Sequence, residues 1–501
     1  MKTPNVPASE MLCERYAVTL NTTPTVCMAA RVSAMPYNWG WPGEQRSLDQ
    51  TEIAGFVRCE SNEPVEVCVT LKDPFEEICL RPLHAGVALE REGQTVRFTL
   101  PGPGQYILEP NDFHRALHLF VAPECRLPVQ DENILYYGPG VHEIGLVELH
   151  SNQTVILDAA AVVYGGFVAY GADNITITGT GVLDGSKEVR TSDTGLIAVM
   201  EPEGKAGEDE VFLEEQYLRN FIKDNQVLNG CIRFYHCRNC KVEHITCRDS
   251  STFTIVPAIC ENVVIEDVKL IGMWRYNSDG IDFFNCTNCV IRNSFLRNFD
   301  DCVVVKGIFG WGHRRNENIL VENCVVWCDW GRALEIGAET NASEYVNILF
   351  RNCDVVHGSW LLLDIQHHND AYIHDVVFDN IRCEYTRHQQ PMKIQGSKEE
   401  KYEEAKPVFA YPALLGAFCY DMGLFGSPHG KETMERIRFK DIQVLSDEEV
   451  PMQAIQFQGL NEDCCIRDVV LENITRNGVA LKDPKSANLQ CNAFAYDVIL
   501  K

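Results

Sequence analysis

The chain has 501 residues, with 44 basic and 71 acidic side chains and a formal net charge of −27. This charge repels nucleic-acid phosphates and anionic lipid surfaces, so we expect neither nucleic acid nor a membrane as a partner. No run of about 18 apolar residues occurs, and no apolar segment follows Lys2 as in an export signal. The sequence therefore predicts a cytoplasmic protein, long enough for more than one domain, whose oligomeric state is left open.

Residues 1–125 contain short runs in which apolar and polar residues alternate. Examples are PVEVCVTL (64–71), TVRFTL (95–100) and ALHLFVA (116–122), with Gly, Pro and Asn clustered between them. Alternating runs separated by turn residues are typical of an all-β sandwich. We predict an N-terminal β-sandwich domain over 1–125, a companion to the reaction site.

From about residue 150 the sequence repeats a short motif, in which a polar residue precedes alternating apolar residues and a second polar residue follows them. Successive copies from Asn239 to Asp375 start 23, 26, 30, 29 and 28 residues apart, too long for a hairpin meander. This interval fits a solenoid coil of two or three short strands, with Asn stacking at its corners. The copies are NCKVEHI (239–245), NVVIEDV (262–268), NCVIRNS (288–294), NILVENC (318–324), NILFRNC (347–353), DVVFDNI (375–381), RIRFKDI (436–442) and DVVLENI (468–474).

We therefore predict an all-β protein in which a right-handed parallel β-helix, residues 126–501, follows the sandwich. An insertion at about 385–432 interrupts the repeat and carries a charged stretch and then an aromatic, Gly-rich one. This insertion either covers a groove as a lid or is a decorated loop, and we lean slightly toward the lid.

The 22 cysteines recur inside apolar runs of the repeat. We expect most of them to be reduced and buried, as in a cytoplasmic enzyme. The Cys-x-x-Cys pairs Cys237/Cys240 and Cys286/Cys289 raise zinc as an alternative. Because both pairs occupy the same place in successive repeats, stacked core positions are the better explanation.

Three carboxylates stand out from the repeat: Asp279, and the adjacent pair Asp300 and Asp301. Asp279 precedes Asp300 by 21 residues, close to one coil, so all three can meet on one face of the solenoid. Hydrolysis of a glycosidic bond needs one carboxylic acid to protonate the leaving oxygen and one carboxylate to activate water. Like charges at close range raise at least one pKa and keep that proton available. Singly, each Asp could be a turn former; together they favour catalysis.

The two motifs resemble those of the polygalacturonase-like glycoside hydrolases (family 28), with an N-terminal β-sandwich as in the related dextranase and isopullulanase group (family 49). NSDGIDFF (277–284) is similar to the family's Asn-Thr-Asp-Gly-Phe-Asp, and DDCVVVKG (300–307) to its Asp-Asp-Cys segment. The resemblance implies that Asp300 is the general acid and that Asp279 and Asp301 position and deprotonate water in one inverting displacement. Asp282 would support them, and no metal or organic cofactor is implied.

The sequence also departs from the polygalacturonase pattern. GRALEIG (331–337) places Arg332 where the family has the His of Gly-His-Gly, and LLLDIQHHND (361–370) stands where its Arg-Ile-Lys motif would be. Lys306, Arg314, Arg315 and Arg332 can form a local basic pocket for a sugar carboxylate. Equally, Arg332 can pair with Glu335 or with a catalytic acid, and both interpretations stay open. Specificity for galacturonate is therefore in doubt.

Several further residues are candidates for contacts with the sugar. Adjacent strand residues point to opposite faces, which argues against a metal shared by His367 and His368. Tryptophan rings suit stacking on sugars, although packing in the core explains them about as well. The predicted substrate-binding residues are Asn277, Asp282, Lys306, His313, Arg332, Glu335, Asp364, His367, Trp274 and Trp311, with His368 and Trp330 as secondary candidates.

The most specific function that these features predict is an inverting glycoside hydrolase, exo-acting on an oligosaccharide or polysaccharide. A polysaccharide lyase or epimerase on uronate-containing glycans is one alternative, for which Lys306 and Arg332 are the only support. A non-catalytic, glycan-binding β-helix is the other.

Overall fold

The structure is a computed structural model built almost entirely of β-strands, with two short 3-10 helices, η1 (Leu48–Gln50) and η2 (Leu83–Ala85). Across the described part of the chain, no helix has the length and apolar character needed to cross a membrane. The structure describes residues 1–4, 6–38, 46–125, 127, 132–188, 230–307, 314–397, 399–421 and 433–501.

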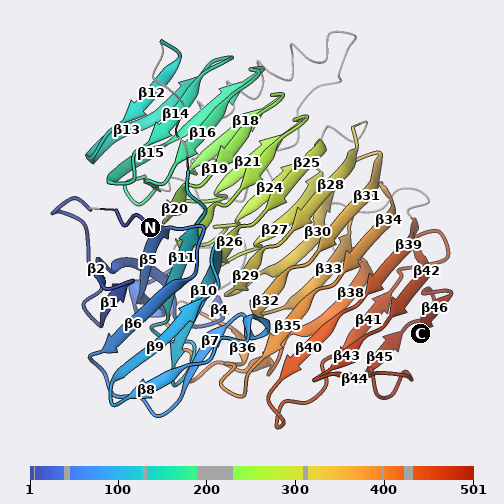
Figure 1. Ribbon diagram of the computed structural model, residues 1–501. Helices are drawn as coiled ribbons and strands as arrows, with labels where there is room; N and C mark the ends of the chain where they lie inside the picture. The colour runs from blue at the N-terminus through green and yellow to red at the C-terminus, as the bar shows by residue number, and fades with distance from the viewer. Residues whose placement is uncertain are drawn as a thin grey trace.

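Two five-stranded sheets stack face to face between residues 16 and 122 (Figure 1). Burial alternates along β6 and β9 of the first sheet, because one face meets the second sheet and the other meets solvent. The first sheet holds, in order, β2 (Thr23–Thr25), β1 (Tyr16–Leu20), β6 (Val65–Leu71), β9 (Thr95–Leu100) and β8 (Glu90–Glu92); the second holds β3 (Met28–Ser33), β5 (Thr51–Glu60), β11 (Leu117–Ala122), β10 (Gly104–Pro110) and β7 (Ile78–Arg81).

A solenoid follows, in which one coil adds one strand to a 12-stranded sheet and two strands to a 21-stranded sheet. Neighbouring coils pair in parallel, so the predicted right-handed parallel β-helix, preceded by a smaller β-sandwich, is confirmed. The 12-stranded sheet holds β12 (Ile134–Tyr137), β14 (Thr154–Leu157), β16 (Thr176–Gly179), β19 (Lys241–Glu243), β22 (Val264–Glu266), β25 (Thr287–Arg292), β28 (Asn316–Glu322), β31 (Glu344–Arg351), β34 (Tyr372–Asp379), β39 (Thr433–Lys440), β42 (Cys465–Glu472) and β46 (Val498–Leu500).

The 21-stranded sheet wraps around the rest of each coil and carries the candidate site. Its strands are β13 (Gly140–Leu149), β15 (Ala161–Tyr170), β17 (Val182–Asp184), β18 (Ile232–Tyr235), β20 (Thr246–Arg248), β21 (Ile255–Ala258), β23 (Lys269–Met273), β24 (Ile281–Phe284), β26 (Phe295–Asn298), β27 (Val303–Gly307), β29 (Val325–Cys328), β30 (Arg332–Thr340), β32 (Asp354–His357), β33 (Leu361–His367), β35 (Arg382–Tyr385), β38 (Ala413–Cys419), β40 (Gln443–Ser446), β41 (Ile455–Gln458), β43 (Thr475–Arg476), β44 (Val479–Ala480) and β45 (Leu489–Cys491).

Stacked asparagines define the corners of the coils. Asn318 donates a hydrogen bond from Nδ2 to Oδ1 of Asn288 at 2.9 Å and accepts one from Asn347 at 3.2 Å. All three have φ near +55°, a left-handed conformation that Asn tolerates better than most residues. A second ladder, five residues later in each repeat, joins Asn323 and Asn352 in the same way. In β28 and β31 the residue of the first ladder therefore lies inside the strand, and that of the second ladder follows the last strand residue.

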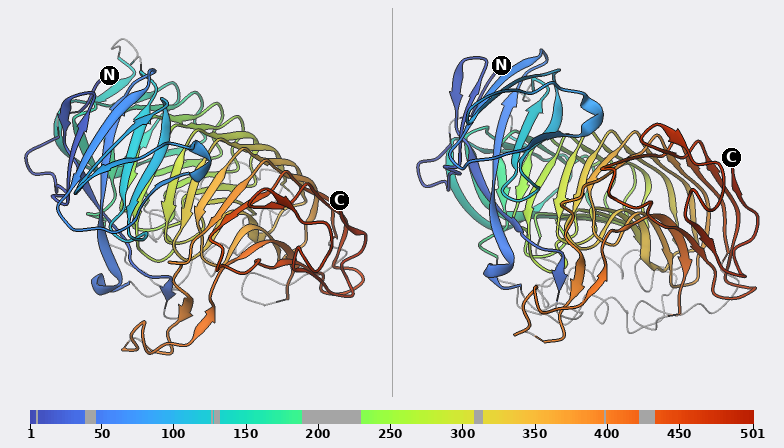
Figure 2. Two further views of the ribbon diagram at one scale, coloured as in Figure 1. Left: turned by 60° about the horizontal axis from the view of Figure 1, so that its bottom comes forward. Right: turned by 90° about the horizontal axis from the view of Figure 1, so that it is seen from below.

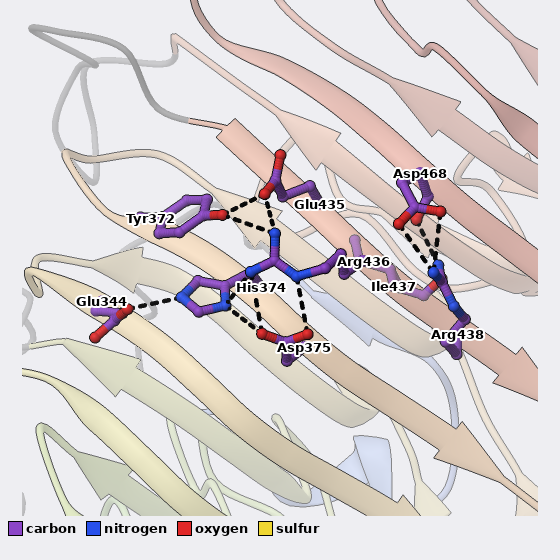
Figure 3. A network of polar contacts seen from close by, with 9 residues as sticks. All are labelled: Glu344, Tyr372, His374, Asp375, Glu435, Arg436, Ile437, Arg438 and Asp468. Atoms are coloured by element: carbon purple, nitrogen blue, oxygen red, sulfur yellow. Dashed lines mark hydrogen bonds and ion pairs between the residues drawn. The ribbon is translucent and has the colours of Figure 1, made fainter.

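Toward the C-terminus, charged residues replace asparagine in the first ladder (Figure 3). Asp375, Arg436 and Asp468 occupy the same left-handed corner, with φ of 53°, 55° and 49°. Arg436 bonds to Asp375 through Nε at 2.9 Å, and Arg438 bonds to Asp468 through Nη2 at 2.9 Å. Ion pairs thus continue the stacking that amide side chains begin.

Most of the cysteines are buried and pack as small apolar side chains. All 22 are free thiols, and Cys237, Cys260 and Cys286 lie in the core of the solenoid in successive coils. The backbone N–H of Cys237 lies 3.3 Å from Sγ of Cys260. This stacking is the arrangement that the repeated Cys-x-x-Cys pairs predicted.

The predicted insertion at 385–432 is interrupted by a coil strand. β38 pairs with β33 and β41 as part of the solenoid, although its segment lacks the Asn corner motif by which the other coils are found. Before it, β36 (Met392–Ile394) and β37 (Pro407–Phe409) form a small sheet with β4 (Tyr37–Asn38) from the N-terminal part (Figure 2). Residues 422–432 lie outside the described part.

The sandwich packs along the side of the solenoid (Figure 2). Every residue of β11 is buried, because Leu117 and Leu119 face the sandwich core while Phe120 faces the solenoid. The ring of Phe120 lies 5.0 Å from that of Phe295, a solenoid residue. The two parts of the chain therefore share one apolar interface.

Candidate active site

The three predicted catalytic aspartates lie in adjacent coils, at the starts of β24 and β27. The backbone N–H of Gly280 donates to the carbonyl of Asp301 at 2.8 Å, which sets the Asp279 segment directly beside Asp300 and Asp301. The lack of a side chain permits this contact, since a Cβ at Gly280 would lie 2.2 Å from the carbonyl oxygen of Cys302. The coil spacing read from the sequence is therefore the one that brings these carboxylates together.

A buried lysine joins the carboxylates. Nζ of Lys306 lies 3.6 Å from Oδ2 of Asp279, 3.4 Å from Oδ2 of Asp301 and 3.0 Å from Oε2 of Glu339. Such a buried ammonium is stable only when several anions surround it. Although burial alone would lower it, the pKa of Lys306 is raised well above its usual range by Glu339, Asp301 and Asp279.

Strand register places three more carboxylates in one row. Asp282 on β24 pairs with Val304 on β27, Val304 pairs with Glu335 on β30, and Glu335 pairs with Asp364 on β33. Side chains at paired positions of parallel strands share one face, so Asp282, Glu335 and Asp364 face the same side. All three are fully buried.

Arg332 contributes the second cation of the cluster. Its Nε lies 3.4 Å from Oδ2 of Asp364 and 3.9 Å from Oε1 of Glu335, and its backbone N–H donates to Oδ1 of Asp301 at 2.9 Å. Gly331 permits this approach, because a Cβ there would lie 2.5 Å from Oδ1 of Asp301. The sequence left open whether Arg332 forms a pocket for a sugar carboxylate or pairs with acids of the protein. In the structure it pairs with Asp364 and Glu335.

The pKa values of Asp300 and Asp301 are shifted in opposite directions. Burial raises the pKa of Asp300 to about 7, and the charge of Asp301 adds to the rise against Lys306 and Arg332. Burial also acts to raise the pKa of Asp301, but Lys306 and Arg332 outweigh it and lower this pKa below its usual range. Near neutral pH the adjacent pair therefore offers one protonated and one ionised carboxyl group.

The remaining carboxyl groups of the cluster favour their neutral forms. Burial raises the pKa of Asp279 well above its usual range, and the nearby charges of Asp282 and Asp300 add to the effect. Burial likewise raises the pKa of Glu335 far above normal, and it raises that of Asp364 to about 6. The cluster thus holds protons at a pH where exposed carboxylates would have lost them.

An aromatic cluster flanks the carboxylates. Tyr276, Phe299 and Trp330 pack with Met392 of β36, and the rings of Phe299 and Trp330 stack at 6.0 Å. Tyr276 adjoins Asn277, and Phe299 adjoins Asp300, so these rings fix the loops that carry the site. Through Met392, the small sheet formed by β36, β37 and β4 rests on this cluster.

The structure brings together most, but not all, of the residues predicted for the site. His367 accepts a hydrogen bond at its ring Nε2 from the backbone N–H of Ala371 at 3.3 Å. None of the described contacts joins His367 to the carboxylates. Trp274 lies under the guanidinium of Arg275 at 5.2 Å, and Arg315 pairs with Glu317. His313 and Trp311 lie outside the described residues.

Two site residues were missed from the sequence. Glu339 is the closest partner of Lys306, and Gln366 donates from Nε2 to Oδ2 of Asp364 at 2.6 Å. The period of two along a strand was the signal for both, since Glu339 lies four residues after Glu335 and Gln366 two after Asp364. Among the described residues, no group of three or more His, Cys, Asp or Glu side chains has the arrangement of a metal site.

Sequence comparison confirms the resemblance to family 28. The family model described as "Glycosyl hydrolases family 28" matches residues 167–363, the coils that carry the carboxylates. The "Probable endopolygalacturonase D" of Neosartorya fischeri is 25% identical over 228 residues, covering 42% of this chain and 43% of that protein. The "Exopolygalacturonase" of Cochliobolus carbonum is 26% identical over 204 residues, covering 38% and 37%. The chain aligns with less than half the length of these relatives.

Comparison with solved structures extends the likeness in fold to the whole chain. Dex49A from Penicillium minioluteum matches with a TM-score of 0.62 at 12% identity, covering 100% of this chain and 96% of that one. The exopolygalacturonase from Thermotoga maritima matches with a TM-score of 0.50 at 18% identity, covering 74% and 84%. At these identities the matches establish the fold alone.

Proposed function

We propose that the protein is a glycoside hydrolase that cleaves an O-glycosidic bond in one inverting displacement. Asp300 is the general acid, Asp301 deprotonates the attacking water, and Asp279 helps to hold that water in place. The observation that carries this proposal is the convergence of Asp279, Asp300 and Asp301 from adjacent coils around Lys306. The pKa shifts support it, because the pKa of Asp300 is raised to about 7 and that of Asp301 is lowered. A pair of acids with separated pKa values is what general acid and base catalysis requires.

The proposed step is balanced in protons and electrons. Asp300 gives its proton to the glycosidic oxygen as the bond from that oxygen to the anomeric carbon breaks. Water attacks the anomeric carbon from the opposite face and passes one proton to Asp301. Exchange with solvent then restores the starting protonation, and no redox partner is needed.

A lyase or epimerase is the first alternative. Either enzyme removes a proton next to a sugar carboxylate and needs a cation to neutralise that carboxylate. The two cations of the described cluster, Lys306 and Arg332, are already paired with carboxylates of the protein. Formation of an unsaturated product that absorbs in the ultraviolet, or loss of activity with EDTA, would favour the alternative.

A non-catalytic glycan-binding protein is the second alternative. Binding a neutral glycan needs no buried, protonated carboxyl, and burying so many acids is costly. The crowded cluster therefore favours catalysis.

We also propose exo action on oligosaccharides in the cytoplasm, a location supported by 22 free thiols, since reduced cysteines predominate in reducing compartments.

The test replaces each member of the aspartate pair by its neutral isostere. Asp300→Asn should lower kcat by about a hundredfold to ten-thousandfold, because the proton donor is lost and general acid catalysis is worth about 10² to 10⁴. Asp301→Asn should lower it comparably, and both variants should keep the wild-type circular dichroism spectrum. Near wild-type turnover by Asp300→Asn on a substrate found in an oligosaccharide panel would refute the assignment.

A further inference from the structure

A cavity of about 340 Å³ lies where the sandwich meets the solenoid. Its volume is near the lower end of the range of small-molecule sites, which is about 300 to 1,000 Å³. None of its described lining residues belongs to the aspartate cluster. The cavity combines apolar groups with a few buried polar ones, as sites for small organic molecules do. The apolar lining includes Phe120, Ala122 and Pro139, and the buried polar lining includes Arg58, Thr246 and Lys269.

Strand alternation directs Arg58 toward the solenoid. On β5, Val57 and Cys59 lie in the core of the sandwich. Arg58, between them, points to the opposite face, as does Phe56, which packs at the interface with the solenoid. Its Nη2 donates to the backbone carbonyl of Ala159, a solenoid residue, at 3.2 Å. The guanidinium therefore lies at the junction of the two parts.

Thr246 and Lys269 approach the cavity from the solenoid. Thr246 of β20 pairs in register with Lys269 of β23, and the residue after each lies in the solenoid core, so both side chains point outward. The hydroxyl of Thr246 has no hydrogen-bond partner among the described residues. The ammonium of Lys269 lies 2.7 Å from Oδ1 of Asp267, but burial and the charge of Arg58 lower its pKa. A second cation, disfavoured by the charge of Arg58, thus lines the cavity.

Arg58 has no carboxylate partner within ion-pair distance in the described part of the chain. Its Nη1 and Nη2 donate to the backbone carbonyls of Thr180 and Ala159, and its Nε has no hydrogen-bond partner there. Although burial lowers its pKa to about 10, the guanidinium stays charged at neutral pH. Because a buried cation without an anion beside it is costly, an anion in the cavity would stabilise it.

Two carboxylates also line the cavity, but other groups already bind them. Glu60 accepts a hydrogen bond from the hydroxyl of Thr180 at 3.2 Å and one from the backbone N–H of Cys125 at 3.3 Å. Asp158 accepts one from the hydroxyl of Tyr136 at 2.8 Å. These acids therefore do not supply the anion that the guanidinium lacks.

We propose that this cavity binds a small organic carboxylate, with the carboxylate group toward Arg58 and the apolar part beside Phe120. The site is separate from the candidate active site, and the inference does not depend on the proposed function. Arg58 belongs to the sandwich and Lys269 to the solenoid. A bound ligand therefore contacts both parts and should raise the midpoint of thermal unfolding.

Benzoate and benzamide are the matched probes, since they are similar in shape and differ in charge. Calorimetric titration of the wild-type protein at pH 7 should show one benzoate bound per chain. We expect benzoate to bind about tenfold or more tightly than benzamide, which cannot form a charge-assisted pair with a guanidinium. Equal affinity for the two probes, or no binding of benzoate, would overturn the inference.

A substitution identifies the cation responsible. Arg58→Met removes the charge and keeps a long apolar side chain, so it should weaken benzoate binding about tenfold or more and abolish the rise in thermal midpoint. Benzamide binding should change little. Arg97→Met, at an exposed residue paired with Glu92, is the matched control and should bind benzoate as the wild type does. Wild-type affinity for benzoate in Arg58→Met would contradict the assignment.

A crystal of the wild-type protein with 4-bromobenzoate locates the ligand without any substitution. We expect the anomalous signal of bromine in the cavity, beside Phe120. Asp300→Asn should bind benzoate as the wild type does, so failure of the proposed hydrolysis would leave this inference standing. The inference fails if bromine is absent from the cavity, or if Asp300→Asn loses benzoate binding.

Discussion

Asp300 and Asp301 are identical in chemistry and adjacent in sequence, yet their surroundings give them opposite proton affinities. Both are buried, so the difference comes from the cations. Asp301 contacts Lys306 at 3.4 Å and accepts the backbone N–H of Arg332, whereas at Asp300 the charge of Asp301 has a larger effect than either cation. The location of Lys306 and Arg332 thus decides which of the two aspartates holds a proton near neutral pH.

The pH dependence of kcat/KM follows from this asymmetry. The acid must be protonated, so activity should be full below the pKa of Asp300, about 7, and fall as the pH rises through it. Arg332→Gln removes a cation that favours the ionised form of Asp300, so the alkaline limb should shift to higher pH. A rate profile measured from pH 4 to 10 on both proteins checks this, and an alkaline limb that shifts downward in the variant contradicts it.

For single residues, the sequence predicts which acidic side chains lie close together but not which of them are ionised. Coil spacing brought Asp279 to Asp300 and Asp301, and the strand period could have found Glu339. The ion pairs of Arg332 depend on distances between three strands, and these distances cannot be read from the spacing of residues in the sequence. His367 was a candidate because of its neighbours in sequence, yet its ring faces the backbone of Ala371.

Among the elements, the asparagine ladders turn a local sequence motif into a regular coil. Each ladder residue satisfies two needs, a left-handed backbone conformation and a side-chain bond to the next coil. The sequence predicts the ladder well, because both needs are local to the repeat. It could not predict that β36 pairs with β4, since their register joins Lys393 to Tyr37 across the whole chain.

Two substitutions of Asn318 separate the contribution of the side-chain hydrogen bonds from that of the left-handed backbone conformation. Asn318→Ala loses the ladder bonds and places a Cβ in a left-handed conformation, so we expect it to be destabilised by about 2 kcal/mol. Asn318→Gly loses the same bonds without the conformational penalty and should be destabilised less. Urea denaturation of both variants measures the difference, and a glycine variant that is no more stable than the alanine variant would contradict the account.

For the molecule as a whole, the sandwich packs against the side of the solenoid formed by β26, β29 and β32. Buried polar contacts reinforce the apolar interface: Arg81 of the sandwich bonds to Glu109 at 2.6 Å, and Glu109 bonds to His357 of the solenoid at 2.5 Å. The sequence predicted a sandwich and a solenoid, but their contact joins residues hundreds of positions apart and is visible only in the structure.

A substitution at the interface tests whether the two parts unfold together. Phe120→Ala removes a buried ring that contacts Phe295, and should cost about 3 to 5 kcal/mol. Because Trp327 lies in the same apolar cluster, tryptophan fluorescence and far-ultraviolet circular dichroism should follow one shared transition. Phe98→Ala, within the sandwich core, is the matched control and should lower that same transition. Two separate transitions in either variant would show that the parts unfold independently.

In the proposed reaction these carboxylates carry out a single displacement at the anomeric carbon. Proton NMR of the first product formed from a cleaved oligosaccharide, recorded before mutarotation, tests it most directly. We expect the new reducing end to have the anomeric configuration opposite to that of the bond cleaved. Retention of configuration would mean a covalent intermediate and would contradict the roles given to Asp279, Asp300 and Asp301.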